Sequence, residues 1–254
     1  MTPVKTSLTV FLKHEKTKAS LTEYLAHKML GHYRHSKKAL VVSTESGTFS
    51  HHMSVNHLTN THEEGDTLII LHAIDIHTNG SIVHLLSPDP DVFVLALKYF
   101  PSIGSETCIY LGTGQKQRLV PLKPIYDIIG SDMTTALPGF HSFTGCDTTG
   151  RFVEKGKLTC WNTLQKAKTH VVKVFKLLGT TEMPFEDIVH CLEEYVCQLY
   201  SSTTTAKNVG KLRWQLFKRS QSEAEKLPPT IGALRHHILR AQCTLPGHGM
   251  ASCW

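Results

Sequence analysis

The 254-residue sequence lacks several patterns that would assign it to a class of protein at once. No apolar run approaches the roughly 20 residues of a membrane-spanning helix, and the first residues have no signal-peptide pattern. No internal repeat occurs either. We therefore expect an intracellular protein, nuclear or cytoplasmic, without a membrane partner. Its oligomeric state is not indicated by any of these patterns.

Cysteine and histidine motifs are also missing. The seven cysteines include no Cys-x-x-Cys pair, which argues against a zinc ribbon or a thioredoxin-like redox site. Their odd number favours reduced thiols. The densest histidine group, at positions 51, 52, 57 and 62, lacks the His-Glu-x-x-His spacing that places two imidazoles on one helical face. We interpret these histidines as polar loop or partly buried residues.

Acidic residues are fewer than basic ones, 21 against 27, and the imbalance is uneven. Residues 1–150 hold 12 Lys and Arg against 13 Asp and Glu, whereas residues 151–254 hold 15 against 8. A basic second half is expected if it holds a polyanion near the first. Lys and Arg that merely solvate helices would give the same imbalance.

Six of the acidic residues fall in three short motifs at the edges of apolar runs. These are Glu63-Glu64-Gly65-Asp66, Asp89-Pro90-Asp91 and Gly145-Cys146-Asp147. Neighbouring carboxylates repel one another unless a cation neutralises them, and Mg²⁺ prefers such oxygen ligands. Two ions about 3.5–4 Å apart can activate a water and stabilise the leaving oxygen of a phosphodiester. We hypothesise that the three motifs converge into one metal site.

The pattern up to residue 150 alternates between strands and helices. Strands are expected at 39–43, 81–87, 108–111 and 118–122, with a short edge strand in the loop 45–62. Helices are expected at 21–30, from 63, at 92–100, at 124–129 and at 132–143. This alternation predicts a mostly parallel sheet with helices on both faces, which binds ligands at the carboxyl edge of its strands.

Local signals refine these elements. Ser20 is a candidate N-cap and Gly31 a candidate end for the first helix. The uniformly apolar strand 81–87 predicts a central position in the sheet, and Asp89 and Pro90 suit the N-cap and first position of the next helix. The Gly112-Thr113-Gly114 turn is either a hairpin or a weak phosphate-loop signal. After residue 147 only helices are expected, at 158–167, 171–178, 185–200, 209–220 and 231–241.

In order and spacing, the acidic motifs resemble those of PIN-like nucleases of the flap endonuclease/XPG type. The intervals from Asp66 to Asp89 (23 residues) and from Asp91 to Asp147 (56 residues) match that series. More narrowly, the runs at 62–67, 137–141, 144–149 and 227–230 are similar to a group of animal proteins derived from mobile elements.

This resemblance implies a three-layer α/β/α Rossmann-like domain over residues 1–178 and a helical, basic region over 179–254. It implies two Mg²⁺ or Mn²⁺ ions and DNA or RNA phosphodiesters as substrates. The implied metal ligands are Glu64, Asp66, Asp89, Asp91 and Asp147, and the four aspartates are also the catalytic residues. Lys155 and Lys157, at the opening of a helix, are implied to bind nucleic-acid phosphates.

The resemblance departs from the family at the start of the chain. The family's first metal-binding aspartate, on an N-terminal strand, has no counterpart here, and we expect the sequence to be truncated. One alternative is therefore an inactive nuclease-like remnant that binds nucleic acid or protein. Another is a glycosyltransferase whose Asp89-Pro90-Asp91 holds Mn²⁺ and a nucleotide diphosphate, which leaves Asp147 unexplained. The acids could also serve only as helix N-terminal residues.

Overall fold

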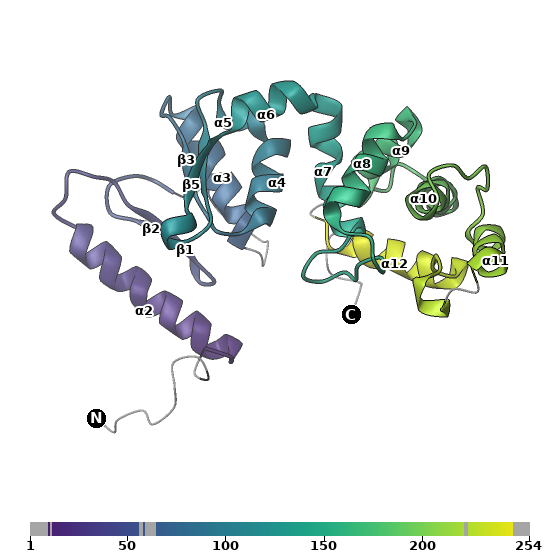
Figure 1. Ribbon diagram of the computed structural model, residues 1–254. Coiled ribbons are helices and arrows are strands. Elements are labelled where there is room, and N and C mark those ends of the chain that lie inside the picture. The colour runs from purple at the N-terminus through teal and green to yellow at the C-terminus, as the bar shows by residue number, and fades with distance from the viewer. Residues whose placement is uncertain (1–9, 11, 56–57, 59–64, 221–222, 246–254) are drawn as a thin grey trace. The chain divides into compact units, whose positions relative to one another are not determined.

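The computed structural model describes residues 10, 12–55, 58, 65–220 and 223–245 (Figure 1). The fold is mixed α/β, and the chain divides into two compact units, Met1–Ser81 and Ile82–Trp254. The domain boundary predicted after residue 178 falls inside the second unit. Each unit is described by itself. In the described parts of the chain, no helix is long and apolar enough to cross a membrane.

The first unit combines helices with a β-hairpin. Its described elements are α2 (Glu15–Tyr33), β1 (Val41–Thr44), β2 (Gly47–Ser50) and α3 (Gly65–Thr78). The antiparallel β1–β2 pair confirms the predicted strand and the short edge strand after it. The Ser43 hydroxyl lies 2.8 Å from Thr48 Oγ1 across the hairpin and 2.8 Å from His72 Nε2 on α3. The Ser43–His72 hydrogen bond therefore joins the hairpin to the helix.

Helix α2 is longer than the sequence predicted at both ends. Ser20 is not its N-cap, because the helix begins at Glu15 and the Ser20 hydroxyl donates to the Lys16 carbonyl at 2.8 Å. Gly31 does not end it, and the helix continues to Tyr33. Only Ala26 and Leu30 are buried in this helix. The residues at its two ends are polar and have adequate helix propensity. They form a helix without the apolar periodicity from which the sequence prediction was made.

The sheet of the second unit contains β3 (His84–Leu86), β4 (Cys108–Leu111) and β5 (Arg118–Pro121), in that order. β3 pairs with β4 in parallel and β4 with β5 antiparallel. The strand at 81–87 was predicted to be central in the sheet, and this prediction is wrong. Among the described strands β3 lies at an edge, and Leu86 is 68% exposed. An apolar run indicates that a segment is hydrophobic, but it does not predict how many strands will pair with that segment.

The turn between β4 and β5 is a hairpin and not a phosphate loop. A short 3₁₀ helix, η1 (Gly114–Lys116), follows Gly112, whose φ of +84° is one that L side chains rarely adopt. A Cβ at Gly112 would lie 2.9 Å from the Lys116 carbonyl oxygen. The glycine is explained by this close approach of the backbone.

Helices make up the remainder of the second unit (Figure 1). They are α4 (Pro90–Lys98), α5 (Phe100–Ile103), α6 (Leu122–Ile129), α7 (Ser131–Phe143), α8 (Lys157–Lys166), α9 (Thr169–Leu177), α10 (Phe185–Tyr200), α11 (Val209–Ser220), η2 (Ala224–Lys226) and α12 (Ile231–Cys243). The predicted helices after residue 147 are confirmed to within two residues. Their periodic apolar faces meet in one core.

The core of this helical part is centred on the aromatic ring of Phe143, which is fully buried. The ring lies 5.3 Å from Phe152, 5.6 Å from Phe175, 6.1 Å from Tyr195 and 5.2 Å from His237. These partners come from the loop after α7 and from α9, α10 and α12. Because α7 also packs against α4, it connects the core with the helix that follows β3.

The backbones of helices α7 and α9 lie close together at Gly139. A Cβ there would lie 2.2 Å from the Phe175 carbonyl oxygen, and a backbone atom cannot move aside as a flexible side chain can. We expect Gly139→Ala to lower the free energy of unfolding by about 1–3 kcal/mol, measured by urea denaturation. The control is Gly232→Ala, where nothing lies within 4 Å of the new Cβ. Equal effects of the two substitutions would contradict this packing.

Candidate metal centre

Asp89 and Asp91 are held at the beginning of α4. The Asp89 amide donates to Ser87 Oγ at 3.1 Å, and Asp89 Oδ1 accepts from the Asp91 amide at 2.9 Å. Asp89 is the N-cap and Pro90 opens the helix, which confirms the local prediction. One oxygen of Asp89 and one of Asp91 lie within 4.8 Å of each other, so the two half-buried carboxylates form a pair.

The position of this pair in the sheet follows from the chain direction. The Ser87 amide donates to the Tyr110 carbonyl at 3.3 Å, which extends the parallel β3–β4 pairing by one residue. Asp89 therefore follows the carboxyl end of β3 directly, as the sequence predicted. In open α/β sheets, ligands bind at this end.

A histidine from α7 contacts the second carboxylate. His141 Nε2 lies 2.8 Å from Asp91 Oδ1, and the two side chains are 20% and 37% exposed. A carboxylate can only accept, so Nε2 carries the proton of this hydrogen bond. Burial and the nearby Lys157 ammonium lower the pKa of His141 below its ordinary value, although Asp91 opposes them. A neutral imidazole thus orients Asp91 from α7.

Lys157, the first residue of α8, lies against the same site. Its Nζ donates to the His141 carbonyl at 2.6 Å and to Thr144 Oγ1 at 3.0 Å. A cation is favourable at the carboxyl end of α7, because the last carbonyls carry partial negative charge. Burial lowers the pKa of Lys157 to about 8, against the attraction of Cys146, Cys160 and Asp91. The amine of Lys157 therefore makes its hydrogen bonds to groups of the protein itself.

The titration of Lys157 gives a prediction for the metal-free protein. The pKa of Lys157 is about 8 in the folded state and 10.5 without perturbation. Between these values the unfolded chain binds more protons, so the free energy of unfolding gains a contribution that rises with pH. We expect the native protein to gain stability relative to Lys157→Met from pH 8 to pH 10, measured by urea denaturation with chelator present. A difference in stability that is constant over this range would contradict the buried amine.

The loop after α7 carries the third acidic motif. Gly145 has a φ of +108°, and a Cβ there would lie 2.5 Å from Arg151 Cγ. Thr149 Oγ1 accepts from the Cys146 amide at 3.0 Å and donates to the Ser142 carbonyl at 2.5 Å. Burial raises the pKa of the Cys146 thiol, but hydrogen bonds from the Thr148 and Thr149 hydroxyls outweigh it and leave the pKa below its ordinary value. The loop is thus tied to α7.

The other residues proposed from the sequence have different surroundings. Asp147 is exposed and is not among the carboxylates within 4.8 Å of the Asp89–Asp91 pair. Glu64 lies outside the described residues. Asp66 is in the first turn of α3, in the first unit. The Lys155 amine lies 4.9 Å from the Tyr200 ring centroid, and its contact with nucleic acid stays a prediction, as does that of Lys157.

Sequence reasoning missed two members of this site, His141 and Thr144. His141 reaches Asp91 because α7 packs against α4, and Thr144 meets Lys157 at the start of α8. The runs 137–141 and 144–149, which resemble a known group of proteins, contain both residues, and their spacing was a second signal. Positions 141 and 144 are three apart at the end of a helix and therefore lie on one face.

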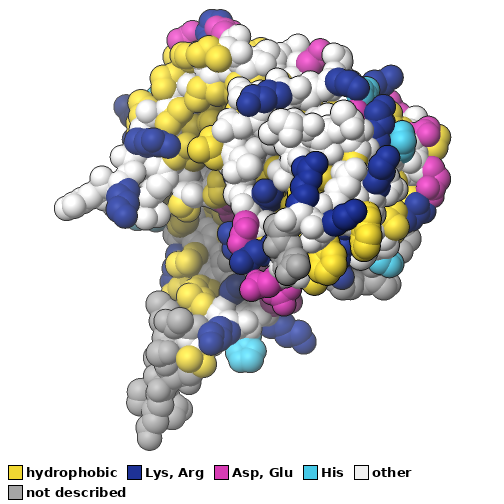
Figure 2. All heavy atoms as spheres, turned by 45° about the vertical axis from the view of Figure 1, so that its right-hand side comes forward, with side chains coloured by type: hydrophobic (Ala, Val, Ile, Leu, Met, Phe, Trp, Pro, Cys, Tyr) yellow, Lys and Arg dark blue, Asp and Glu magenta, His cyan; other side chains and the backbone are white. Residues whose placement is uncertain are grey.

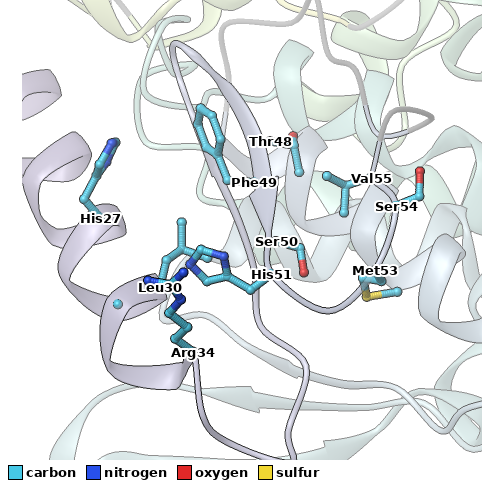
Figure 3. A pocket seen from close by; sticks show the side chains of 11 residues that line it. His27, Leu30, Arg34, Thr48, Phe49, Ser50, His51, Met53, Ser54 and Val55 are labelled. Atoms are coloured by element: carbon cyan, nitrogen blue, oxygen red, sulfur yellow. The ribbon is translucent and has the colours of Figure 1, made fainter.

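A pocket of about 490 Å³ lies in the first unit between α2 and the segment around β2 (Figure 3). Its lining includes Arg34, Phe49 and His51, together with apolar residues such as Leu30. No carboxylate lines it. None of the residues proposed from the sequence for metal or nucleic acid borders this pocket, so it is separate from the Asp89–Asp91 pair.

Comparison of the chain with models of protein families, with curated proteins and with solved structures gives no match.

Proposed function

We propose that the chain is a nuclease-type domain that hydrolyses phosphodiesters of DNA or RNA with Mg²⁺ or Mn²⁺. The observation that carries this proposal is the Asp89–Asp91 pair, fixed by backbone hydrogen bonds after the carboxyl end of β3. The three-layer PIN-like arrangement belongs to the same proposal, and its support is the parallel β3–β4 pair, whose connection contains α4.

The donor atoms of the pair suit a hard divalent cation. Asp89 Oδ1 accepts from an amide and Asp91 Oδ1 from His141. In the described part of the chain, the Oδ2 atom of each carboxylate makes no hydrogen bond with the protein. These two oxygens would hold the ion, with waters completing its shell. The sequence resemblance adds Glu64, Asp66 and Asp147 as further ligands.

The protein would contribute to the proposed reaction by orienting a metal ligand and by placing a positive charge near the site. When bound, the ion would supply an activated water and stabilisation of the leaving oxygen. His141 holds Asp91 in one orientation, as residues behind metal ligands commonly do. Lys157 places a positive charge close to the pair, which favours the approach of a phosphate.

Metal-dependent cleavage tests this proposal. Labelled single-stranded and double-stranded DNA and RNA would be incubated with the full chain and Mg²⁺, Mn²⁺ or EDTA. We expect cleavage that depends on the ion and is abolished by EDTA. Binding of Mn²⁺, measured by electron paramagnetic resonance, checks the site independently of turnover. Failure to bind Mn²⁺ would overturn the proposal, and salt-sensitive nucleic-acid binding without cleavage would favour the inactive remnant.

A further inference from the structure

Helix α11 exposes two large aromatic side chains on one face. Trp214 is 63% and Phe217 50% exposed, and their positions three residues apart place them side by side on the helix. Their ring centroids lie 6.5 Å apart with 31° between the ring planes. The two rings therefore form one continuous apolar surface. Contiguous exposed apolar surface rimmed by polar residues is a mark of interaction sites.

The opposite face of α11 fixes this surface to the core. Val209 and Leu212 are buried, and the Val209 amide donates to the buried Glu193 carboxylate at 2.9 Å. The Arg213 guanidinium donates to the Pro228 carbonyl. The aromatic pair is thus carried by a helix held at several points, so little conformational freedom is lost when a ligand binds.

The charged residues of helix α11 all have one sign. Helix α11 contains four basic residues and no Asp or Glu, and no carboxylate occurs between Glu194 and Glu223. Lys211, Lys218 and Arg219 are exposed, and no ion pair within the described residues neutralises them. On the face of the molecule shown in Figure 2, dark-blue basic side chains lie among yellow apolar ones.

We infer that the α11 face, defined by Lys211, Trp214, Phe217 and Lys218, binds single-stranded nucleic acid. Unpaired bases stack on exposed aromatic rings while lysine and arginine contact the phosphates. A duplex hides its base faces and would use the charges alone. An acidic peptide would satisfy the charges but has no planar bases to cover both rings. The inference rests on the proposed function for its substrate class and adds a preference for unpaired strands.

Binding is measured without catalysis, in EDTA, by the anisotropy of a fluorescein-labelled oligothymidylate. Stacking of one base on an aromatic side chain corresponds to roughly 5- to 150-fold in affinity, so we expect Trp214→Leu to weaken binding within this range. Quenching of tryptophan fluorescence by the oligonucleotide should fall strongly in the same variant. Ile128→Ala, which removes a side chain that is 86% exposed on α6, is the matched control and should bind normally.

The basic residues are tested by the salt dependence of binding. Each phosphate contact on a single strand contributes a slope of about −0.7 in log affinity against log salt concentration. The double substitution Lys211→Gln with Lys218→Gln should therefore make the slope less steep by about 1.4. Lys116→Gln with Arg118→Gln, on the β4–β5 hairpin, removes the same charge elsewhere and should leave the slope nearly unchanged.

Asp89→Asn separates this inference from the proposed function. Unchanged oligonucleotide binding by Asp89→Asn in EDTA supports the α11 face whether or not the chain cleaves. Equal affinity of native protein and Trp214→Leu would overturn the inference. So would tighter binding of a duplex of the same length, or equal tryptophan quenching by polyglutamate.

Discussion

Replacing Asp89 by asparagine is expected to reduce Mg²⁺-dependent cleavage by at least about 100-fold. Loss of a residue that only orients a metal ligand commonly costs 10- to 100-fold in affinity or activity, and Asp89 would bind the ion itself. Asparagine is as good an N-cap as aspartate, so it can still accept from the Asp91 amide and α4 should begin normally. Single-turnover cleavage at saturating Mg²⁺, together with Mn²⁺ binding, measures the effect.

The matched control for this charge is Asp127→Asn. Asp127 pairs with Lys123 at 2.8 Å on the exposed surface of α6, where a pair contributes little to stability. Its cleavage rate should equal that of the native protein. If Asp89→Asn kept the native rate and the native affinity for Mn²⁺, the pair would not be the metal site.

Phe143→Ala is expected to lower the free energy of unfolding by about 3–5 kcal/mol. Phe143 is fully buried and contacts aromatic rings from several segments of the core, so removal of its ring leaves a cavity that no single neighbour can fill. For a unit of this size we expect a fall in melting temperature of roughly 6–20 °C. Thermal denaturation followed by circular dichroism would measure it.

Leu158→Ala provides the comparison for Phe143→Ala. The Leu158 side chain is 72% exposed at the start of α8, and surface substitutions of this kind change stability by about 0.5 kcal/mol or less. A similar loss of stability in both variants would mean that the ring of Phe143 is not central to the core.

The sequence was most informative where local signals agree with one another. α10 begins and ends at the predicted residues because Pro184 precedes a strongly amphipathic segment. The start of α4 was predicted for the same reason, since Asp89 and Pro90 each favour their own position at a helix start. Polar segments carry few local signals that agree with one another, and the sequence therefore predicted α2 to be shorter at both ends than it is.

Non-local pairing lay beyond the sequence pattern. The apolar residues of β3 indicated a strand but not that, among the described strands, only β4 would flank it. In the candidate metal centre, Asp89 and Asp91 could be paired from their own spacing, whereas His141 joins them through the packing of α7 against α4. The remaining predicted ligands, Glu64, Asp66 and Asp147, stay predictions.

Helix α7 presents His141 to Asp91 and, two residues later, Phe143 to the core. If the proposed ion binds there, folding and ion binding are thermodynamically linked, and an ion that binds only the folded unit should raise its melting temperature in proportion to the logarithm of ion concentration. The linkage also acts in reverse. A screen that scores the proposed activity should therefore recover buried core positions such as Val174 on α9 alongside the proposed carboxylate ligands.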